Sequence, residues 1–279
     1  MGTHPKDNLP GTNAGYVHGH SPTESQRLRD QATTLAQLLH NDSFFRPPGL
    51  VLEAGCGTGE QTAILAIQNP ESTFVSIDIA GESLATAEKA IRSQGIQNVQ
   101  FRPADVFNLP FAQESFDHVF VCFLLEHISE PLNALQALKK VLKRGGTITV
   151  IEGDHGSAYY HPRSQAAQAT IQCLIDIQAA LGGNSLIGRE LYPLLVSAGF
   201  QGCSVSPRVV YADASRPEMV DGFTRKTFIA MVEGVREQAI ARGLISQDGW
   251  TRGIADLYRT AGPDGTFSYT FFKAVASKP

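Results

Sequence analysis

VLEAGCGTGEQT, at residues 51–62, is the most informative segment of the chain, because an apolar run passes into three glycines and then into helix-forming residues. Gly55, Gly57 and Gly59 follow a G-x-G-x-G spacing, which differs from the dinucleotide fingerprint G-x-G-x-x-G and from the phosphate loop G-x-x-x-x-G-K-S/T. Glycine lacks a Cβ, so such a turn can bend sharply and lie close to a ligand. The segment therefore predicts a strand, a ligand-holding turn and a helix.

An acidic residue follows the glycines after about 20 residues, in the manner of ribose-binding folds. Asp78 lies near the end of the apolar segment STFVSIDI (72–79), which predicts a second strand. A carboxylate at a strand end can accept both hydroxyls of a ribose. The alternative is a tight turn beside a solvent-facing aspartate, and the combination of the two features favours the nucleoside site.

Strand and helix patterns alternate on both sides of the turn. Apolar segments predict strands at 50–54, 72–79, 99–105, 116–123 and 147–154, and amphipathic segments predict helices at 24–40, 60–68, 83–94 and 131–142. Later segments predict helices at 164–181 and 188–198 and a strand near a sheet edge at 203–213. Helical sequence is predicted throughout 216–260, and a last strand follows at 266–277. This alternation is typical of an α/β fold, with a parallel sheet covered on both faces.

Composition excludes several classes of protein. The 279 residues carry a net charge of −4, which argues against a strongly basic nucleic-acid binder, and 42% hydrophobic residues exclude a disordered chain. No apolar run is long enough to span a bilayer and no signal peptide is visible. The four cysteines form no C-x-x-C pair. We therefore expect a cytoplasmic protein with no membrane and no nucleic-acid partner.

The motifs, in this order, resemble those of the class I S-adenosylmethionine-dependent methyltransferases. They are VLEAGCGTG (51–59), VSIDIAGESL (75–84), PADVFNLPFAQESFDHVFVCFLLEHI (103–128) and KKVLKRGGTITVIEGD (139–154). The resemblance covers about residues 51–153 and is to the ubiquinone/menaquinone-type small-molecule methyltransferases. It implies S-adenosyl-L-methionine as the cofactor and a Rossmann-like, seven-stranded, mostly parallel sheet whose last strand, 266–277, is antiparallel.

The same resemblance implies a cofactor site at the carboxyl ends of the strands. Asp78 is expected to hold the ribose and Asp105 the adenine amino group, with Val106 beside the ring and Phe123 beside the methionine part. The expected cofactor-binding residues are Glu53, Gly55, Cys56, Gly57, Gly59, Gln61, Asp78, Ile79, Asp105, Val106, Phe123, Tyr16 and Gln31.

Methyl transfer is an in-line displacement at carbon, so alignment is the main requirement, and a base is needed only where the nucleophile holds a proton. His127 follows the fourth strand and is the candidate base, with a packing or capping role as the alternative. Glu152 follows the fifth strand and is a candidate to hold a polar or cationic substrate, or to bond a nearby helix end. Tyr16 is the third candidate catalytic residue. The histidines show no metal-ligand spacing, so no metal is expected.

We expect one domain over 1–279, consisting of a mobile arm at 1–22, a helix region at 23–46, a cofactor core at 50–154, and substrate-lid segments at 155–200 and 214–262. The expected function is methyl transfer from S-adenosylmethionine to a small organic acceptor, with an aromatic or heteroaromatic one favoured. A protein or peptide methyltransferase and a non-catalytic S-adenosylmethionine-binding regulator are the main alternatives. An RNA methyltransferase and a nicotinamide dehydrogenase rank lower. The reacting atom stays open, as does the choice between monomer and homodimer.

Overall fold

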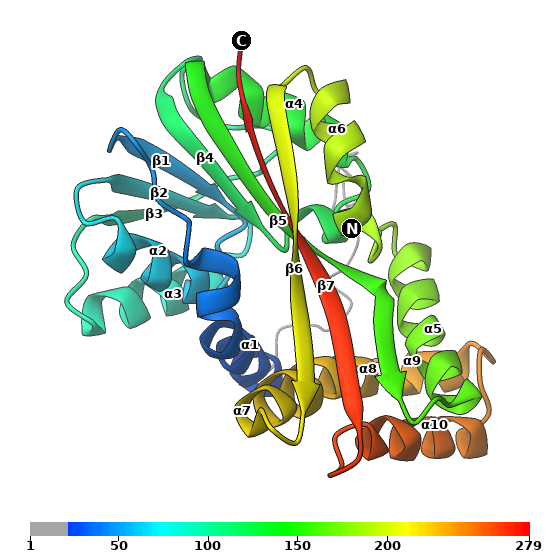
Figure 1. Ribbon diagram of the computed structural model, residues 1–279. Coiled ribbons are helices and arrows are strands. Elements are labelled where there is room, and N and C mark those ends of the chain that lie inside the picture. The colour runs from blue at the N-terminus through cyan, green and yellow to red at the C-terminus, as the bar shows by residue number, and fades with distance from the viewer. Residues whose placement is uncertain (1–21) are drawn as a thin grey trace, which may run out of the picture.

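The computed structural model describes residues 22–279, and its centre is a seven-stranded sheet in the order β3-β2-β1-β4-β5-β7-β6 (Figure 1). The first five strands run parallel, whereas β7 is antiparallel to both β5 and β6. The strands are β1 Leu50–Ala54, β2 Thr73–Asp78, β3 Val99–Pro103, β4 Phe116–Cys122, β5 Leu142–His161, β6 Gln201–Asp213 and β7 Thr266–Ser277. The predicted α/β class and the antiparallel last strand are both confirmed.

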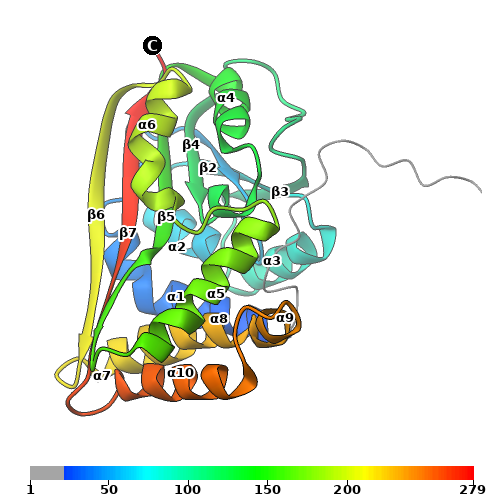
Figure 2. The ribbon, with the colours of Figure 1, turned by 90° about the vertical axis from the view of Figure 1, so that its right-hand side faces the viewer.

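Helices lie on both faces of the parallel part of the sheet, whereas β6 and β7 have no helix of the described residues over the side that faces the viewer in Figure 1 (Figures 1 and 2). The α-helices are α1 Pro22–His40, α2 Glu60–Gln68, α3 Gly81–Ser93, α4 Pro131–Val141, α5 Gln165–Ala180, α6 Leu191–Ser197, α7 Pro217–Met219, α8 Ala230–Glu233, α9 Arg236–Ala241 and α10 Gln247–Arg259. Two 3-10 helices, η1 Leu125–His127 and η2 Ile187–Glu190, and a π-helix, η3 Val220–Ile229, complete the set. Within residues 22–279, no helix has the length and apolar character needed to cross a membrane.

The strand pattern divides the interior into two hydrophobic clusters, one on each face of the sheet. Successive side chains of a strand point to opposite faces. On β4, Val119 and Val121 share a cluster with Leu135 of α4, whereas Phe120 belongs to the other cluster, with Leu39 of α1. The unbroken apolar runs seen in the sequence are therefore strands that are buried on both sides.

β5 is much longer than the predicted strand at 147–154, and this prediction is wrong at both ends. The strand begins at Leu142, which pairs with Phe116 of β4, and it reaches His161 because β7 pairs with it again after an irregularity between Asp154 and Tyr159. As a result β5, β6 and β7 extend beyond the rest of the sheet, and α5, α7, α8 and α10 lie around this extension (Figures 1 and 2). The expected boundary between core and lid at residue 154 falls inside this strand.

The segment 216–260 is helical in pieces, so the prediction of continuous helix is also wrong. Breaks occur at 234–235 and 242–246, and Gly243 adopts a φ of 68° just after α9. The π-helix η3 carries two aromatic residues into the interior. Phe228 lies 4.8 Å from Phe267 and Phe223 lies 5.5 Å from Tyr269, measured between ring centroids. This segment therefore packs against the β7 extension.

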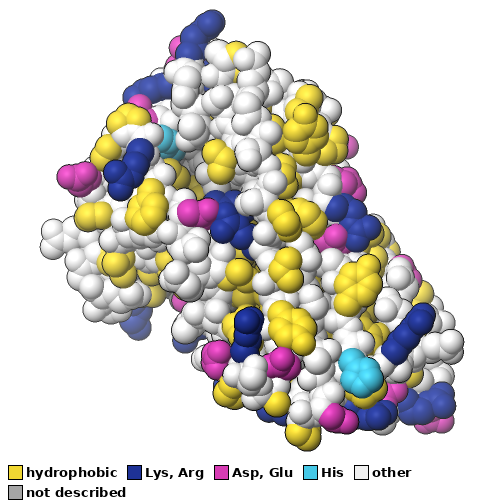
Figure 3. Space-filling model, viewed as in Figure 1, with side chains coloured by type: hydrophobic (Ala, Val, Ile, Leu, Met, Phe, Trp, Pro, Cys, Tyr) yellow, Lys and Arg dark blue, Asp and Glu magenta, His cyan; other side chains and the backbone are white. Residues whose placement is uncertain are grey.

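On the face shown in Figure 3, basic and acidic side chains are interspersed, and no continuous basic surface covers that face. Apolar side chains lie between them, which is normal for a protein surface. The charge distribution on this face gives no indication of a nucleic-acid footprint.

Candidate active site

The glycine turn lies between β1 and α2 and is held against the end of β2. Gly55, Gly57 and Gly59 have φ values of 76°, 52° and 83°, in the left-handed region that favours glycine. The amides of Gly55 and Cys56 both donate to the carbonyl of Ile77, at 2.8 and 3.0 Å. The predicted strand–turn–helix is therefore present, with α2 beginning at Glu60.

The three glycines serve different purposes. A Cβ on Gly59 would lie 2.9 Å from the Cβ of Ala87 on α3, and a Cβ on Gly55 would lie 3.0 Å from Leu124 Cδ1. A Cβ on Gly57 would have no heavy atom within 4 Å among the neighbours that the structure describes. Gly55 and Gly59 are thus needed for close packing, whereas Gly57 presents bare backbone to open space where a ligand can approach.

Asp78 is the last residue of β2 and faces the glycine turn. Its Oδ2 accepts a hydrogen bond from the Gly57 amide at 2.8 Å, and its Oδ1 accepts one from the Ala80 amide at 2.9 Å. The side chain is only partly buried. A carboxylate has about four lone-pair sites, so each oxygen keeps capacity for a further donor, such as a ribose hydroxyl.

Glu53 lies beneath the turn and is 2% exposed. Its Oε2 accepts hydrogen bonds from Thr62 Oγ1 at 2.7 Å and from Ser76 Oγ at 2.6 Å. Burial raises the pKa of this carboxyl group, while the two hydroxyl groups lower it. Glu53 therefore joins β1, β2 and α2, and a direct contact with the cofactor stays a prediction.

The residues expected around the adenine lie after β3. Asp105 Oδ1 accepts the Phe107 amide at 2.9 Å, and the side chain of Val106 is buried. Two further expected contacts differ in exposure, because Cys56 is buried, which raises its thiol pKa, whereas Ile79 is exposed. Their contacts with a cofactor stay predictions.

Phe123 follows β4 directly and has a φ of 56°, unusual for a residue with a large side chain. Its amide donates to the carbonyl of Ile151 at 3.0 Å, and its ring centroid lies 5.5 Å from that of Phe271. Such backbone strain is concentrated at functional sites. The strain adds a structural reason to the earlier prediction that Phe123 lies beside the cofactor.

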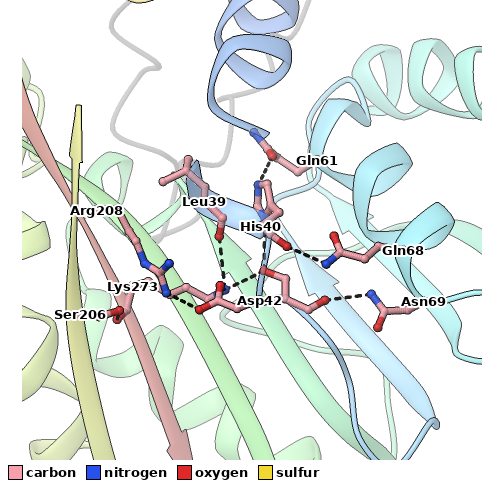
Figure 4. Close-up of polar contacts among 10 residues, drawn as sticks. Leu39, His40, Asp42, Gln61, Gln68, Asn69, Ser206, Arg208 and Lys273 are labelled. Carbon is pink, nitrogen blue, oxygen red and sulfur yellow. Dashed lines mark hydrogen bonds and ion pairs between the residues drawn. The ribbon is translucent and has the colours of Figure 1, made fainter. Parts of the chain in front are cut away.

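Gln61 and Gln31 are both engaged by neighbouring side chains. Gln61 Oε1 lies 2.5 Å from His40 Nε2 at the end of α1 (Figure 4), and Gln31 Oε1 accepts from Arg27 at 2.8 Å. Arg27 also forms an ion pair with Glu24 at 2.6 Å. Their roles as cofactor ligands stay predictions, and Tyr16 lies outside the described residues.

A polar network that sequence reasoning missed joins this end of α1 to β6 and β7 (Figure 4). Lys273 of β7 is 3% exposed, and its ammonium donates to Asp42 Oδ1 at 2.6 Å, Ser43 Oγ at 2.8 Å and the Leu39 carbonyl at 3.3 Å. Arg208 of β6 also pairs with Asp42. A lysine inside an apolar strand, KAVAS at 273–277, was the available signal.

His40, which belongs to this network, makes the stability of the folded protein depend on pH. Burial lowers its pKa from 6.5 to about 4, although the hydrogen bond with Gln61 raises it. The unfolded chain therefore binds this proton near pH 6.5 and the folded protein only near pH 4, so acid favours unfolding. We expect His40 to remove about 3 kcal/mol of stability as the pH falls from about 7 to 4, at about 1.4 kcal/mol per pKa unit.

Urea unfolding of the wild type and of His40→Gln at several pH values measures this effect. The difference between the two proteins isolates His40 from the carboxyl groups that also titrate in this range. Parallel pH profiles for the two proteins would contradict the assignment.

The residues predicted for the acceptor side are found in η1 and β5. His127 Nε2 lies 3.6 Å from Glu126 Oε1, and burial lowers the His127 pKa although Glu126 raises it. Glu152 Oε1 accepts the amides of Leu124 and Leu125, at 3.0 and 2.7 Å. Burial raises the pKa of Glu152 well above its usual value, and Glu126 adds to the rise. Glu152 thus bonds a nearby helix end, and its catalytic role stays a prediction.

Beyond Glu152, β5 carries two further polar residues that are buried. Asp154 accepts both Arg189 Nε, at 2.8 Å, and Arg189 Nη2, at 2.7 Å, which makes a bidentate ion pair. His155 Nδ1 lies 2.8 Å from Tyr269 Oη. Across residues 22–279, no group of three or more metal-ligating side chains is arranged to hold a metal ion.

Comparisons with known proteins agree with this architecture. The family model for the methyltransferase domain matches residues 49–199, which is more than half of the chain. An uncharacterised 37.1 kDa protein in transposon TN4556 of Streptomyces fradiae is 29% identical over 221 residues, covering 76% of this chain and 63% of that protein. The ubiquinone/menaquinone biosynthesis C-methyltransferase UbiE of Ectopseudomonas mendocina is 36% identical over 112 residues, covering 39% of this chain and 44% of that protein. The chain therefore spans less than two thirds of the length of these relatives.

Among solved structures, the crystal structure of the [4+2]-cyclase SpnF matches with a TM-score of 0.54 and 22% identity, over 90% of this chain and 80% of that one. This likeness concerns the fold. The family match covers β1 through α6, including the glycine turn, Asp78 and the end of β4. The chain belongs to the methyltransferase-domain family, that of the class I S-adenosylmethionine-dependent methyltransferases.

Proposed function

We propose that the protein transfers a methyl group from S-adenosylmethionine to a small organic acceptor that is aromatic or heteroaromatic. The observation that carries this proposal is the pairing of Gly57 with Asp78. Bare backbone faces open space at Gly57, and the carboxylate that accepts its amide has lone pairs left for a ribose. The quinone-methylating relative supports a small acceptor with a ring.

Each residue at the strand ends would bind a different part of the cofactor. Asp78 would accept the ribose hydroxyls and Asp105 the adenine amino group, while Val106 and Phe123 would pack on apolar surface. S-adenosylmethionine supplies the activated methyl group when it is bound. The protein's contribution is alignment of methyl and nucleophile, which by itself lowers a barrier by several kcal/mol.

The acceptor would lie beyond Phe123, where aromatic rings continue from the cofactor site. Phe123 contacts Phe271, and the ring of Phe271 lies 4.8 Å from Tyr269 and 5.9 Å from Phe223 of η3. Tyr269 and Phe271 belong to β7, and Phe223 belongs to η3, within the segment 214–262 that is proposed to cover the substrate. His127, whose lowered pKa keeps it neutral at pH 7, would take a proton from the acceptor where one must leave.

Two measurements on the full chain test the proposal. Calorimetry measures binding of S-adenosylmethionine, and tritium-labelled methyl groups are followed into a panel of phenols, hydroxyquinones and aryl amines. We expect micromolar binding and transfer to at least one member, with one S-adenosylhomocysteine formed per methyl transferred. Binding without transfer would favour the regulator. Failure to bind would refute the proposal, and the cyclase of the same fold shows why transfer itself must be measured.

A further inference from the structure

Beside the proposed acceptor site, one of its aromatic residues, Tyr269, pairs with a buried histidine that has no role in the steps above. His155 of β5 and Tyr269 of β7 are 114 positions apart in the chain, yet His155 Nδ1 lies 2.8 Å from Tyr269 Oη. The two residues are 4% and 2% exposed. Among the described residues, none offers a hydrogen-bond partner to His155 Nε2, which is shielded from solvent.

The pair determines which nitrogen of the imidazole carries the proton. Burial raises the pKa of Tyr269 and lowers that of His155, so both groups are neutral at pH 7. A buried hydroxyl needs an acceptor for its hydrogen, and His155 Nδ1 is the side-chain acceptor that the described part of the chain offers to Tyr269. A neutral imidazole carries one proton. With Nδ1 accepting from Tyr269, the imidazole hydrogen lies on Nε2, and this tautomer is part of the proposal made below.

Packing keeps this pair in place. Gly153 has no room for a side chain, because a Cβ there would lie 2.4 Å from Tyr269 Oη. The imidazole lies among aromatic rings, with the centroid of Phe228 at 6.3 Å and that of Tyr269 at 5.9 Å. The imidazole is therefore held within a largely aromatic surround.

The charged groups around the imidazole interact with partners other than His155. Glu126, His127, Asp154 and Arg27 act on it electrostatically from η1, β5 and α1. Asp154 forms its ion pair with Arg189, and Glu126 Oε2 accepts from Gln178 at 3.3 Å. An unsatisfied buried donor is costly, and native proteins keep few of them. His155 Nε2 thus lacks a hydrogen-bond partner within the described part of the chain, and an acceptor atom of a ligand would supply one.

We propose that His155 Nε2–H is a substrate-binding donor, and that the methyl acceptor is an uncharged ring compound whose carbonyl, phenol or enol oxygen accepts this hydrogen bond. This inference rests on the proposed function and narrows its substrate class from any small ring compound to an oxygen-bearing one. An ammonium group in this position has only hydrogen-bond donors, so it could not accept the hydrogen of His155 Nε2. An uncharged ring also fits the aromatic residues of η3 and β7.

The proton position is tested directly by NMR on the full chain with 15N-labelled histidine. The signal of His155 is identified as the one that disappears in His155→Phe. We expect a protonated Nε2 and a bare Nδ1 in the wild type, and loss of this fixed tautomer in Tyr269→Phe. Tyr258→Phe is the matched control, because that hydroxyl lies on α10 and bonds Glu233. A proton on Nδ1 in the wild type would overturn the proposal.

The substrate class is tested with three probes of one shape, namely 1-indanone, indane and 1-aminoindane, titrated into protein saturated with S-adenosylhomocysteine. 1-Indanone should bind about tenfold more tightly than indane, because its ketone oxygen accepts one neutral hydrogen bond. His155→Phe should lose this preference and Tyr258→Phe should keep it. Equal binding of ketone and hydrocarbon, as when a water satisfies Nε2–H, or tighter binding of the amine, refutes the proposal.

A calorimetric titration with S-adenosylhomocysteine, made first, distinguishes a failure of the proposed function from a failure of the inference about His155. Wild-type protein that does not bind S-adenosylhomocysteine would refute the proposed function. The NMR measurement would still decide whether His155 presents a donor, because it needs no cofactor.

Discussion

Replacing Asp78 with alanine is expected to raise the dissociation constant for S-adenosylmethionine by about a hundredfold or more. The variant lacks the carboxylate that would accept hydrogen bonds from the ribose hydroxyls. Hydrogen bonds to a charged group contribute about 1.5–3 kcal/mol each. A loss of about 3 kcal/mol corresponds to slightly more than a hundredfold in affinity. Calorimetry with S-adenosylmethionine measures the change.

Stability should fall much less than affinity in this variant. The amides of Gly57 and Ala80 lose their side-chain acceptor, but Asp78 is only partly buried, so water can reach them. Urea unfolding should show a loss of about 1 kcal/mol, because water replaces the carboxylate at both amides and offsets most of the two lost hydrogen bonds. Asp78→Asn keeps one carbonyl acceptor and should lose less affinity, and Asp264→Ala serves as a remote control. Unchanged affinity in Asp78→Ala would contradict the assignment of the ribose.

Gly59→Ala is expected to destabilise the protein by about 3 kcal/mol. A residue with a side chain is strained at a φ of 83°, which costs about 1 kcal/mol. The added Cβ would also lie 2.9 Å from the Cβ of Ala87 and 3.2 Å from its Cα, so α3 must move. Overpacking of this kind adds about 1–3 kcal/mol.

Gly95→Ala is the matched control for the strain alone. Gly95 has a φ of 74°, and a Cβ there would meet no heavy atom within 4 Å among the described neighbours. We expect it to cost about 1 kcal/mol, the strain contribution without the clash. Urea unfolding of both variants measures the difference. Equal losses in the two would show that the contact with α3 does not require glycine at position 59.

Local patterns predicted the cofactor half of the molecule well. β1 and α2 begin and end at the predicted residues, because the apolar run and the glycine turn between them mark their limits, and β7 also has the predicted bounds. The glycine turn and Asp78 face each other as expected, joined by the Gly57 amide. These features depend on residues close together in the sequence, and local sequence determines them.

The remaining features depend on contacts between distant segments. The start of β5, LKRGG, combines charges with glycines, and its end, HGSAYYH, lacks a clear alternation, so neither indicates a strand. Both become strand only by pairing with β4 or β7. In the same way, Tyr269 bonds His155, and Lys273 bonds Asp42. No local pattern predicts such pairs, which form when β7 joins the sheet.

The strand order β5-β7-β6 also has a consequence for how the chain is synthesised. β6 pairs only with β7 in the described sheet, so residues 201–213 have no strand to join until residues 266–277 leave the ribosome. The nascent chain can assemble the parallel half around the glycine turn earlier, since domains gain structure as they emerge. Until then β6 and the outer side of β5 present open edges, which are prone to aggregation. A nascent chain stalled before Thr266 would therefore be a natural client for chaperones.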